Sequence, residues 1–199
     1  MPLHSPHRAR AFPRTPLTLV AACALVVCAP TLDWREVRPP GTHLLLLFPC
    51  KPSAQQRQVP LAGQPVLLTL HACAAGGQTW GLAVADVADP ARVAPALAAF
   101  SASAAANIGA APPGADPLAV PIAVPIAVPI AAPFAVRGAT PNRGSQRLLL
   151  QGKLPDGTRV TLHAAVFSHG TQVFQASVLG EQVSADAADT FFDALRVLP

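Results

Sequence analysis

The residues from Arg159 to Pro199 constrain the fold most strongly, because two strand patterns are followed there by a helix pattern. Apolar residues recur with a period of two in Val160–Phe167 and again in Gln172–Leu179, and this is the period of a β-strand. His169 and Gly170 interrupt the alternation between these two stretches. The sequence therefore predicts a β-hairpin in front of the last helix.

The closing helix has a recognisable start and a single apolar face. Ser184 is a suitable N-cap, and Asp186 lies in the first turn, where the helix dipole favours a carboxylate. The apolar residues then recur at helical spacing: Ala188, Phe191, Phe192 and Leu195. Such a face must be buried, and the preceding hairpin supplies a sheet for it.

A second amphipathic helix is predicted after Asp89-Pro90, a side-chain N-cap followed by a proline at the first helical position. Its apolar stripe consists of Val93, Leu97, Phe100, Ala104 and Ile108. Gly109 is a suitable helix stop. This helix also needs a sheet face against which to pack.

Further strand patterns fill most of the remaining chain. Gly76-Gly77 and the segment Leu154–Thr158 carry the turn residues of hairpins. The strands are expected at Asp33–Arg38, Leu44–Phe48, Gln56–Leu61, Pro65–Ala74, Gln78–Val87 and Gln146–Gly152. We predict a single α+β domain over residues 33–199, in which two main helices pack on one antiparallel sheet.

An Ala-Val-Pro-Ile repeat interrupts this pattern between Ala110 and Val136. The repeat runs from Leu118 to Ile130, and a decayed copy ends at Phe134. A proline at every fourth residue is incompatible with a regular helix or a central strand. We therefore expect a disordered, extended loop over about 110–136, produced by repeat expansion; an adhesive surface protein acting through this repeat is an alternative function.

Residues 1–29 have the composition of an export leader. Arg8, Arg10 and Arg14 precede an apolar run from Leu17 to Ala29, as in a secretory signal peptide. The run is short of the roughly 20 residues that span a bilayer. An uncleaved signal-anchor helix or a wrongly assigned start are the alternatives.

The positive charge of the chain is concentrated in this leader. The formal net charge is +4, but three of the 14 Lys and Arg are the leader arginines, which leaves 11 against 10 Asp and Glu. Aromatic residues make up only 5% of the chain. Because a nucleic-acid-binding surface needs clustered basic residues, we expect no nucleic-acid partner.

Two leader cysteines lie in patterns that resemble the bacterial lipoprotein signal, in which a cysteine becomes the lipidated first residue. Leu25-Val26-Val27-Cys28 fits the position after the apolar run, although Val27 replaces the usual small residue. Cys23 follows two alanines, but only a short apolar run precedes it. We expect lipidation at Cys28, with Cys23 as the weaker candidate.

Cys50 and Cys73 then remain in the folded part of the chain. Two cysteines in an oxidising compartment are candidates for a disulfide, and each lies at the end of a predicted strand. Such a bridge stabilises the fold by about 3 kcal/mol in the chain-entropy model. We predict a Cys50–Cys73 disulfide; the alternative is two buried, unpaired thiols.

The order of elements, the turn Phe48-Pro49-Cys50-Lys51-Pro52 and the paired Phe191-Phe192 in the final helix resemble a known group. The chain is similar to small exported bacterial proteins, often lipoproteins, with a PsbP-like α/β/α sandwich. The resemblance implies an antiparallel sheet covered by helices and a last short strand after the final helix. Members of this group mostly lack an assigned reaction, so the resemblance implies no catalytic residue.

Motifs for catalysis, metals and cofactors are absent from the sequence. HExxH, paired CxxC, P-loop, GxGxxG and GxSxG patterns do not occur. The remaining candidates for a site are better explained as structural or solvated residues: His43, His71, His163, His169, Asp186, Asp189, Asp193, Trp34, Trp80 and Lys51. We therefore expect no catalytic residue, no metal and no cofactor.

The resulting functional hypothesis is a non-enzymatic, membrane-anchored accessory or binding protein on the periplasmic side of a bacterial membrane. It rests on the leader, on the missing catalytic motifs and on the PsbP-like pattern. An envelope hydrolase whose site is assembled from distant residues is the alternative. A concave pocket with convergent polar groups would favour the hydrolase.

Overall fold

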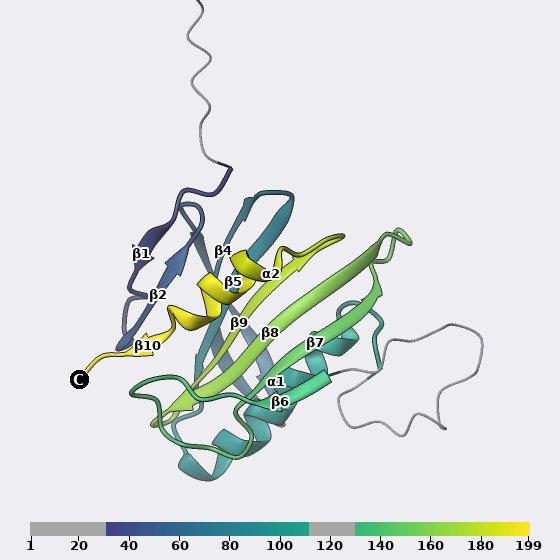
Figure 1. Ribbon diagram of the computed structural model, residues 1–199. Coiled ribbons are helices and arrows are strands. Elements are labelled where there is room, and N and C mark those ends of the chain that lie inside the picture. Colours follow the sequence, from purple (N-terminus) through teal and green to yellow (C-terminus); the bar gives the residue numbers. More distant parts are fainter. Residues whose placement is uncertain (1–30, 112–129) are drawn as a thin grey trace, which may run out of the picture.

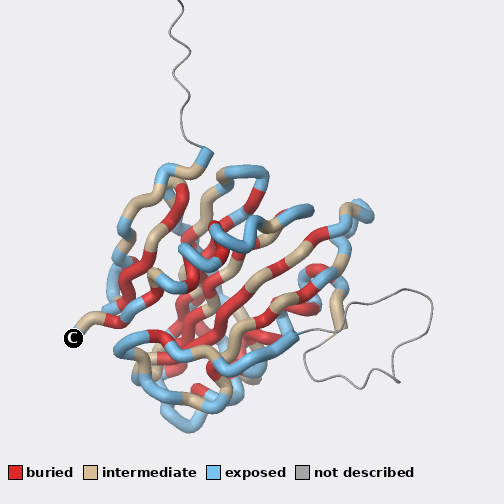
Figure 2. The backbone as a smooth tube through the Cα atoms, viewed as in Figure 1, coloured by how far each residue is buried: buried red, intermediate tan, exposed pale blue. Residues whose placement is uncertain are grey.

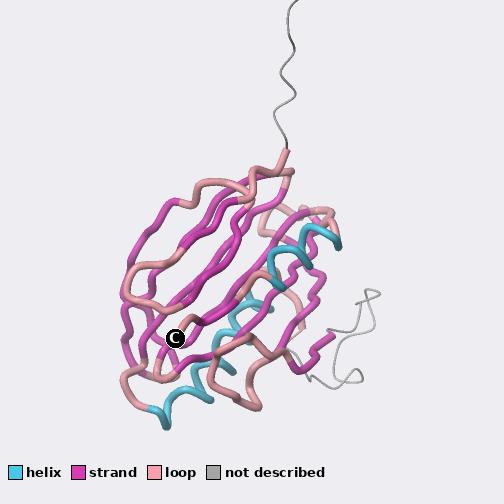
Figure 3. The backbone as a smooth tube through the Cα atoms, turned by 60° about the vertical axis from the view of Figure 1, so that its left-hand side comes forward, coloured by secondary structure: helices cyan, strands magenta, loops and turns pink. Residues whose placement is uncertain are grey.

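The computed structural model describes residues 31–111 and 130–199, in which two antiparallel sheets and two α-helices form a mixed α+β fold (Figures 1 and 3). The large sheet has seven strands in the order β3-β4-β5-β9-β8-β7-β6, and the small sheet has the order β1-β2-β10. The elements are β1 (Arg35–Val37), β2 (Leu44–Phe48), β3 (Ser53–Leu61), β4 (Gln64–Ala75), β5 (Gln78–Asp86), η1 (Pro90–Arg92), α1 (Val93–Ala106), β6 (Ile130–Pro133), β7 (Gln146–Lys153), β8 (Arg159–His169), β9 (Gln172–Gly180), α2 (Ala185–Asp193) and β10 (Arg196–Val197). The α+β class, the antiparallel pairing and the two helices are confirmed.

Two predictions fall outside the described residues. The leader over residues 1–29, including its expected signal or anchor helix with Cys23 and Cys28, is one of them. The larger part of the proline repeat, residues 112–129, is the other.

Helix α1 covers one face of the large sheet. Its predicted stripe is buried, with Leu97 and Ala104 fully enclosed and Phe100 5% exposed. The stripe packs on strand residues that point to this face, such as Val166 of β8 and Val173 of β9. As predicted, Asp89 caps the first turn by accepting a hydrogen bond from the backbone N–H of Ala91 at 2.9 Å, although this turn is the short 3-10 helix η1.

Helix α2 and the small sheet cover the opposite face, and Figure 1 shows them on the near side of the large sheet, with α1 behind it. Ser184 caps α2 as predicted, by accepting from the backbone N–H of Ala187. The apolar face of α2 meets core residues from both sheets: Leu44, Leu46 and Phe48 of β2, and Trp80, Leu82, Phe167, Phe174 and Val178 of the large sheet. Buried segments accordingly concentrate along the strands between the layers (Figure 2).

The expectation of one sheet is wrong, because β2 belongs to a separate sheet. Glu36 pairs with Leu47 on one side of β2, and Arg196 of β10 pairs with Leu45 on the other. An entirely apolar strand fits the middle of either sheet, so its sequence does not distinguish the two. The prolines at 49 and 52 separate β2 from β3, which pairs with β4 instead.

The predicted turns are confirmed. Gly76 and Gly77 connect β4 to β5 with φ values of 62° and 72°, which suit glycine and give the two-residue turn its twist. The segment 154–158 connects β7 to β8, and its Asp156 accepts a hydrogen bond from the backbone N–H of Thr158 at 2.9 Å. These turns set the register of the adjoining strands.

The expected loop over about 110–136 is wrong at its end, where the decayed repeat copy forms the edge strand β6. Ile130 pairs with Leu149 of β7, and Phe134 donates its backbone N–H to Ser145 at 3.1 Å. Hydrogen-bonded and free positions alternate along a strand. Because Phe134 is hydrogen-bonded to Ser145, which directly precedes β7, its neighbour Pro133 occupies a position at which a backbone N–H would face away from β7. An edge strand tolerates proline at such a position.

Gly152 allows the turn that follows α1 to dock on β7. A Cβ at this position would overlap with the carbonyl group of Ile108, which accepts the backbone N–H of Lys153 at 2.7 Å. We expect Gly152→Ala to lower the free energy of unfolding by about 1–3 kcal/mol, because the helix end must move. Urea denaturation measures the loss; Gln151→Ala, at an exposed neighbouring position, is the control. Equal stability of the two variants would contradict the close approach.

Candidate functional site

A disulfide joins the two sheets. Cys50 lies just after β2, Cys73 lies within β4, and their Cα atoms are 6.1 Å apart at a sequence separation of 23. This separation of the Cα atoms is normal for a disulfide. The predicted pairing is confirmed, and the alternative of two unpaired thiols is wrong.

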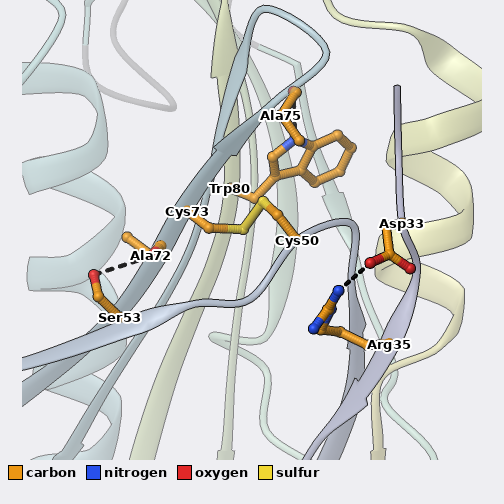
Figure 4. Close-up of a disulfide and its surroundings, with 8 residues drawn as sticks. All are labelled: Asp33, Arg35, Cys50, Ser53, Ala72, Cys73, Ala75 and Trp80. Carbon is orange, nitrogen blue, oxygen red and sulfur yellow. Dashed lines mark hydrogen bonds and ion pairs between the residues drawn. A yellow bond between two sulfur atoms is a disulfide. The ribbon is translucent and has the colours of Figure 1, made fainter. Parts of the chain in front are cut away.

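Trp80 packs directly against this disulfide (Figure 4). It is opposite Cys73 in the β4–β5 register, and its indole N–H donates to the carbonyl of Ala75 at 3.1 Å. Its ring makes edge contacts with Trp34 at 5.6 Å and with Phe191 of α2 at 5.3 Å. The interpretation of Trp80 as a core residue is confirmed, since its side chain is fully buried.

Side chains of α2 and β7 meet at Arg147. The Arg147 guanidinium donates to Asp189 of α2 at 2.7 Å and lies 4.5 Å from the ring centre of Phe192. The Arg147 side chain is 28% exposed and that of Asp189 is 56% exposed, so water screens the ion pair. A stacked arginine of this kind combines a cation–π contact with an ion pair and has a fixed orientation.

Next to Arg147, three residues that are paired with one another form a row across three strands. Ile130 of β6 is paired with Leu149 of β7, which is paired with His163 of β8. Ile130 is 58% exposed, whereas Leu149 and His163 are half-buried. We call these three residues and Arg147 the β6–β8 patch. It presents aliphatic groups, one imidazole and one oriented guanidinium on the sheet face that also carries α2.

His163 is held in its neutral form in this patch. Burial lowers its pKa from the usual 6.5, and the positive charge of Arg147 lowers it further, while Asp189 acts in the opposite direction. A neutral imidazole can both donate and accept hydrogen bonds at neutral pH. The patch is therefore chemically suited to binding a ligand with both apolar and polar groups.

The four histidines are less scattered than the sequence implies. His43, before β2, lies beside His169 at the end of β8, with 6.3 Å between ring centres. His71 on β4 is buried, which lowers its pKa. Across residues 31–111 and 130–199, no three His, Cys, Asp or Glu side chains are grouped to hold a metal ion.

The carboxylates of α2 and Lys51 lie on the surface. Asp186 and Asp193 are exposed on α2, as the interpretation of a solvated face requires. Asp189 is exposed as well, and it also forms an ion pair with Arg147. Lys51 is exposed after β2. In the part of the chain that the structure describes, no helix combines the length and apolar character needed to cross a membrane.

The β6–β8 patch is not visible in the sequence. Arg147 and Asp189 are far apart in the chain, and Ile130 belongs to the repeat, which was expected to form a loop. One available signal is the period of two in Gln146–Gly152, which places Arg147 and Leu149 on the same face. The neighbouring strands follow only from long-range pairing.

The lowered pKa values of His71, which is buried, and His163, which is half-buried, predict that the stability of the protein depends on pH. Because the pKa values of His71 and His163 are lowered below 6.5, the unfolded chain binds more protons as the pH falls through this value. The free energy of unfolding should therefore be highest above pH 6.5 and decrease on acidification. We expect His163→Gln to show a smaller decrease, measured by denaturant unfolding between about pH 5 and 8. Gln151→Asn is the control, and an unchanged slope in His163→Gln would contradict the assignment.

Comparison of the chain with models of protein families and with curated protein sequences gives no match.

Proposed function

We propose that this chain is a non-enzymatic binding or accessory protein of the bacterial cell envelope, exported and held at the periplasmic side of a membrane by its leader. The observation that carries the proposal is the Cys50–Cys73 disulfide, which connects the two sheets. Disulfides of this structural kind persist in oxidising compartments. The arginine-containing, apolar leader independently supports the same location.

The PsbP-like assignment is part of this proposal. Its support is the α+β arrangement with antiparallel sheets, the last short strand β10 after α2, and the Phe48–Pro52 turn that carries the disulfide.

The β6–β8 patch is the surface that we assign to the binding role, because it combines an exposed aliphatic residue with an oriented arginine. The expected partner is an envelope protein whose surface offers an apolar group to Ile130 and an acidic group to Arg147.

The intact mass of the protein, extracted from membranes of its host, tests the location. We expect a chain that begins at Cys28 and carries a diacylglycerol group. After denaturation and reduction, its mass should increase by two hydrogens as the disulfide opens. The Cys28→Ser variant should lose the lipid, whereas Cys23→Ser should retain it.

Two other results would contradict the proposed lipidation site or the proposed export. A lipid that is lost in Cys23→Ser would move the anchor to Cys23. An unprocessed chain beginning at Met1 whose Cys50 and Cys73 thiols are free would contradict both the export and the envelope role.

A further inference from the structure

The two edges of the large sheet are built differently. Strand β6 at one edge has four residues and contains Pro133. Strand β3 at the other edge has nine residues, most of them exposed, and Arg57 is its only charged residue. Sheet edges are normally protected by short strands, charges, prolines or bulges, because free backbone groups can pair with another chain. Over most of its length β3 has none of these protections.

Two prolines show which backbone groups of β3 face away from β4. Pro60 of β3 is directly opposite Pro65 of β4, and neither can donate a hydrogen bond. This pair must therefore be a non-hydrogen-bonded one, and the alternation makes Ala54, Gln56 and Gln58 non-hydrogen-bonded to β4 as well. The two-residue turn at Ala62-Gly63 agrees, because it places the Leu61–Gln64 pair at a hydrogen-bonded position.

The free edge thus presents the N–H and C=O groups of Ala54, Gln56 and Gln58. Within residues 31–111 and 130–199, no other strand pairs with this edge. We propose that the edge binds a second copy of this chain: two β3 strands pair antiparallel about a two-fold axis at Gln56, and the two large sheets become continuous.

Self-pairing has one favourable register. With Gln56 opposite Gln56 of the second copy, Ala54 is opposite Gln58, and all outward N–H groups between the two prolines 52 and 60 find carbonyl acceptors. Arg57 then lies opposite Gln55. Centring the pair on Arg57 would place two arginines side by side and Ala54 opposite Pro60, which lacks a donor. Centring it on Gln55 would place Gln58 opposite Pro52, with the same loss.

The composition of β3 also favours a second copy over a charged partner. Its outward-facing residues Ala54, Gln56 and Gln58 are uncharged, so two copies approach along this edge with little repulsion. A two-fold axis perpendicular to the sheet leaves both α1 helices on the same face of the continuous sheet. The β6–β8 patches then lie at its two far ends and remain free for the proposed binding role.

Cysteine cross-linking in the full chain tests this register. In a hydrogen-bonded antiparallel pair the Cα atoms are about 5.5 Å apart, within the range of a disulfide. We expect oxidised Gln56→Cys to form a covalent dimer at twice the mass of the monomer, and reduction should reverse it. The wild type, which retains the leader cysteines, provides the background.

Gln58→Cys is the matched control, because it changes the same residue type on the same edge and face. Its two copies would be four residues out of register, about 14 Å along the strand, and should not cross-link. The double variant Ala54→Cys/Gln58→Cys should cross-link again, since these positions are opposite each other. No dimer from Gln56→Cys, or equal dimer from Gln58→Cys alone, would overturn the proposal.

A charge exchange provides a second test without cysteines. Gln56→Lys and Gln56→Glu should each be monomeric alone, because like charges meet at the two-fold axis. An equimolar mixture of the two should regain the doubled mass in sedimentation velocity. Ala132→Lys, which adds a charge to the β6 edge, should remain dimeric. Single variants that each remain dimeric would assign the dimer to another surface, and a mixture that stays monomeric would contradict the pairing of Gln56 with Gln56.

Discussion

The Trp80→Ala variant is expected to lose about 3–5 kcal/mol of the free energy of unfolding, the largest effect that we predict for a single substitution. Trp80 is fully buried in the core between the two sheets and α2. It packs on the disulfide, on Trp34 from the N-terminal segment and on Phe191 of α2. Removal of the indole leaves a cavity between the two sheets, and the disulfide keeps those sheets from closing over it.

Guanidinium chloride denaturation, followed by circular dichroism, measures this loss. Trp80→Phe is the matched control, because it retains a ring and gives up mainly the 3.1 Å hydrogen bond to Ala75. We expect its loss to be clearly smaller. Trp34→Ala should also cost less, since Trp34 is only half-buried. If Trp80→Ala unfolds at the same denaturant concentration as Trp34→Ala, Trp80 does not have the central packing role assigned to it.

Loss of the disulfide is expected to have the second-largest effect. In the double variant Cys50→Ala/Cys73→Ala, the free energy of unfolding should fall by about 3 kcal/mol, because the unfolded chain is no longer constrained by the closed loop. The bridge also joins the segment after β2 to β4, and these strands belong to different sheets. The double replacement avoids leaving one reactive thiol beside Trp80.

Thermal and denaturant unfolding of the variant, compared with oxidised and reduced wild type, checks this prediction. Reduced wild type should behave as the double variant does. Ser53→Ala, which removes only an exposed hydrogen bond to Ala72 near the bridge, is the control and should stay close to oxidised wild type. Stability that does not change on reduction would show that the native contacts alone hold the small sheet in place.

The local features of the fold were predictable from the sequence. Ser184 and Asp89 cap the helices as expected, and the predicted apolar stripes are the buried faces of α1 and α2. The Gly76-Gly77 turn and the final hairpin also occur where their residues indicate. Each of these features depends on residues within a few positions of one another, so the pattern itself contains the physical cause.

The candidate site was much harder to predict from the sequence. The contact of Arg147 with Asp189 and Phe192 depends on how α2 packs on the large sheet, and the proximity of His43 and His169 depends on the docking of the small sheet. The sequence offered only the alternation that puts Arg147 and Leu149 on one face. Asp189 is exposed, as the sequence predicts, but helical spacing alone does not reveal its partner Arg147 on a distant strand.

By itself, the sequence determined the α+β class, the helix ends, the apolar faces and the pairing of Cys50 with Cys73. Only the tertiary structure decided that β2 forms a second sheet with β1 and β10, and that the end of the proline repeat becomes the edge strand β6. The physical reason is the range of the interactions. Caps, turns and periodic faces arise from neighbouring residues, whereas a strand accepts any partner of suitable shape and polarity. The choice among partners is made by the packing of the whole core.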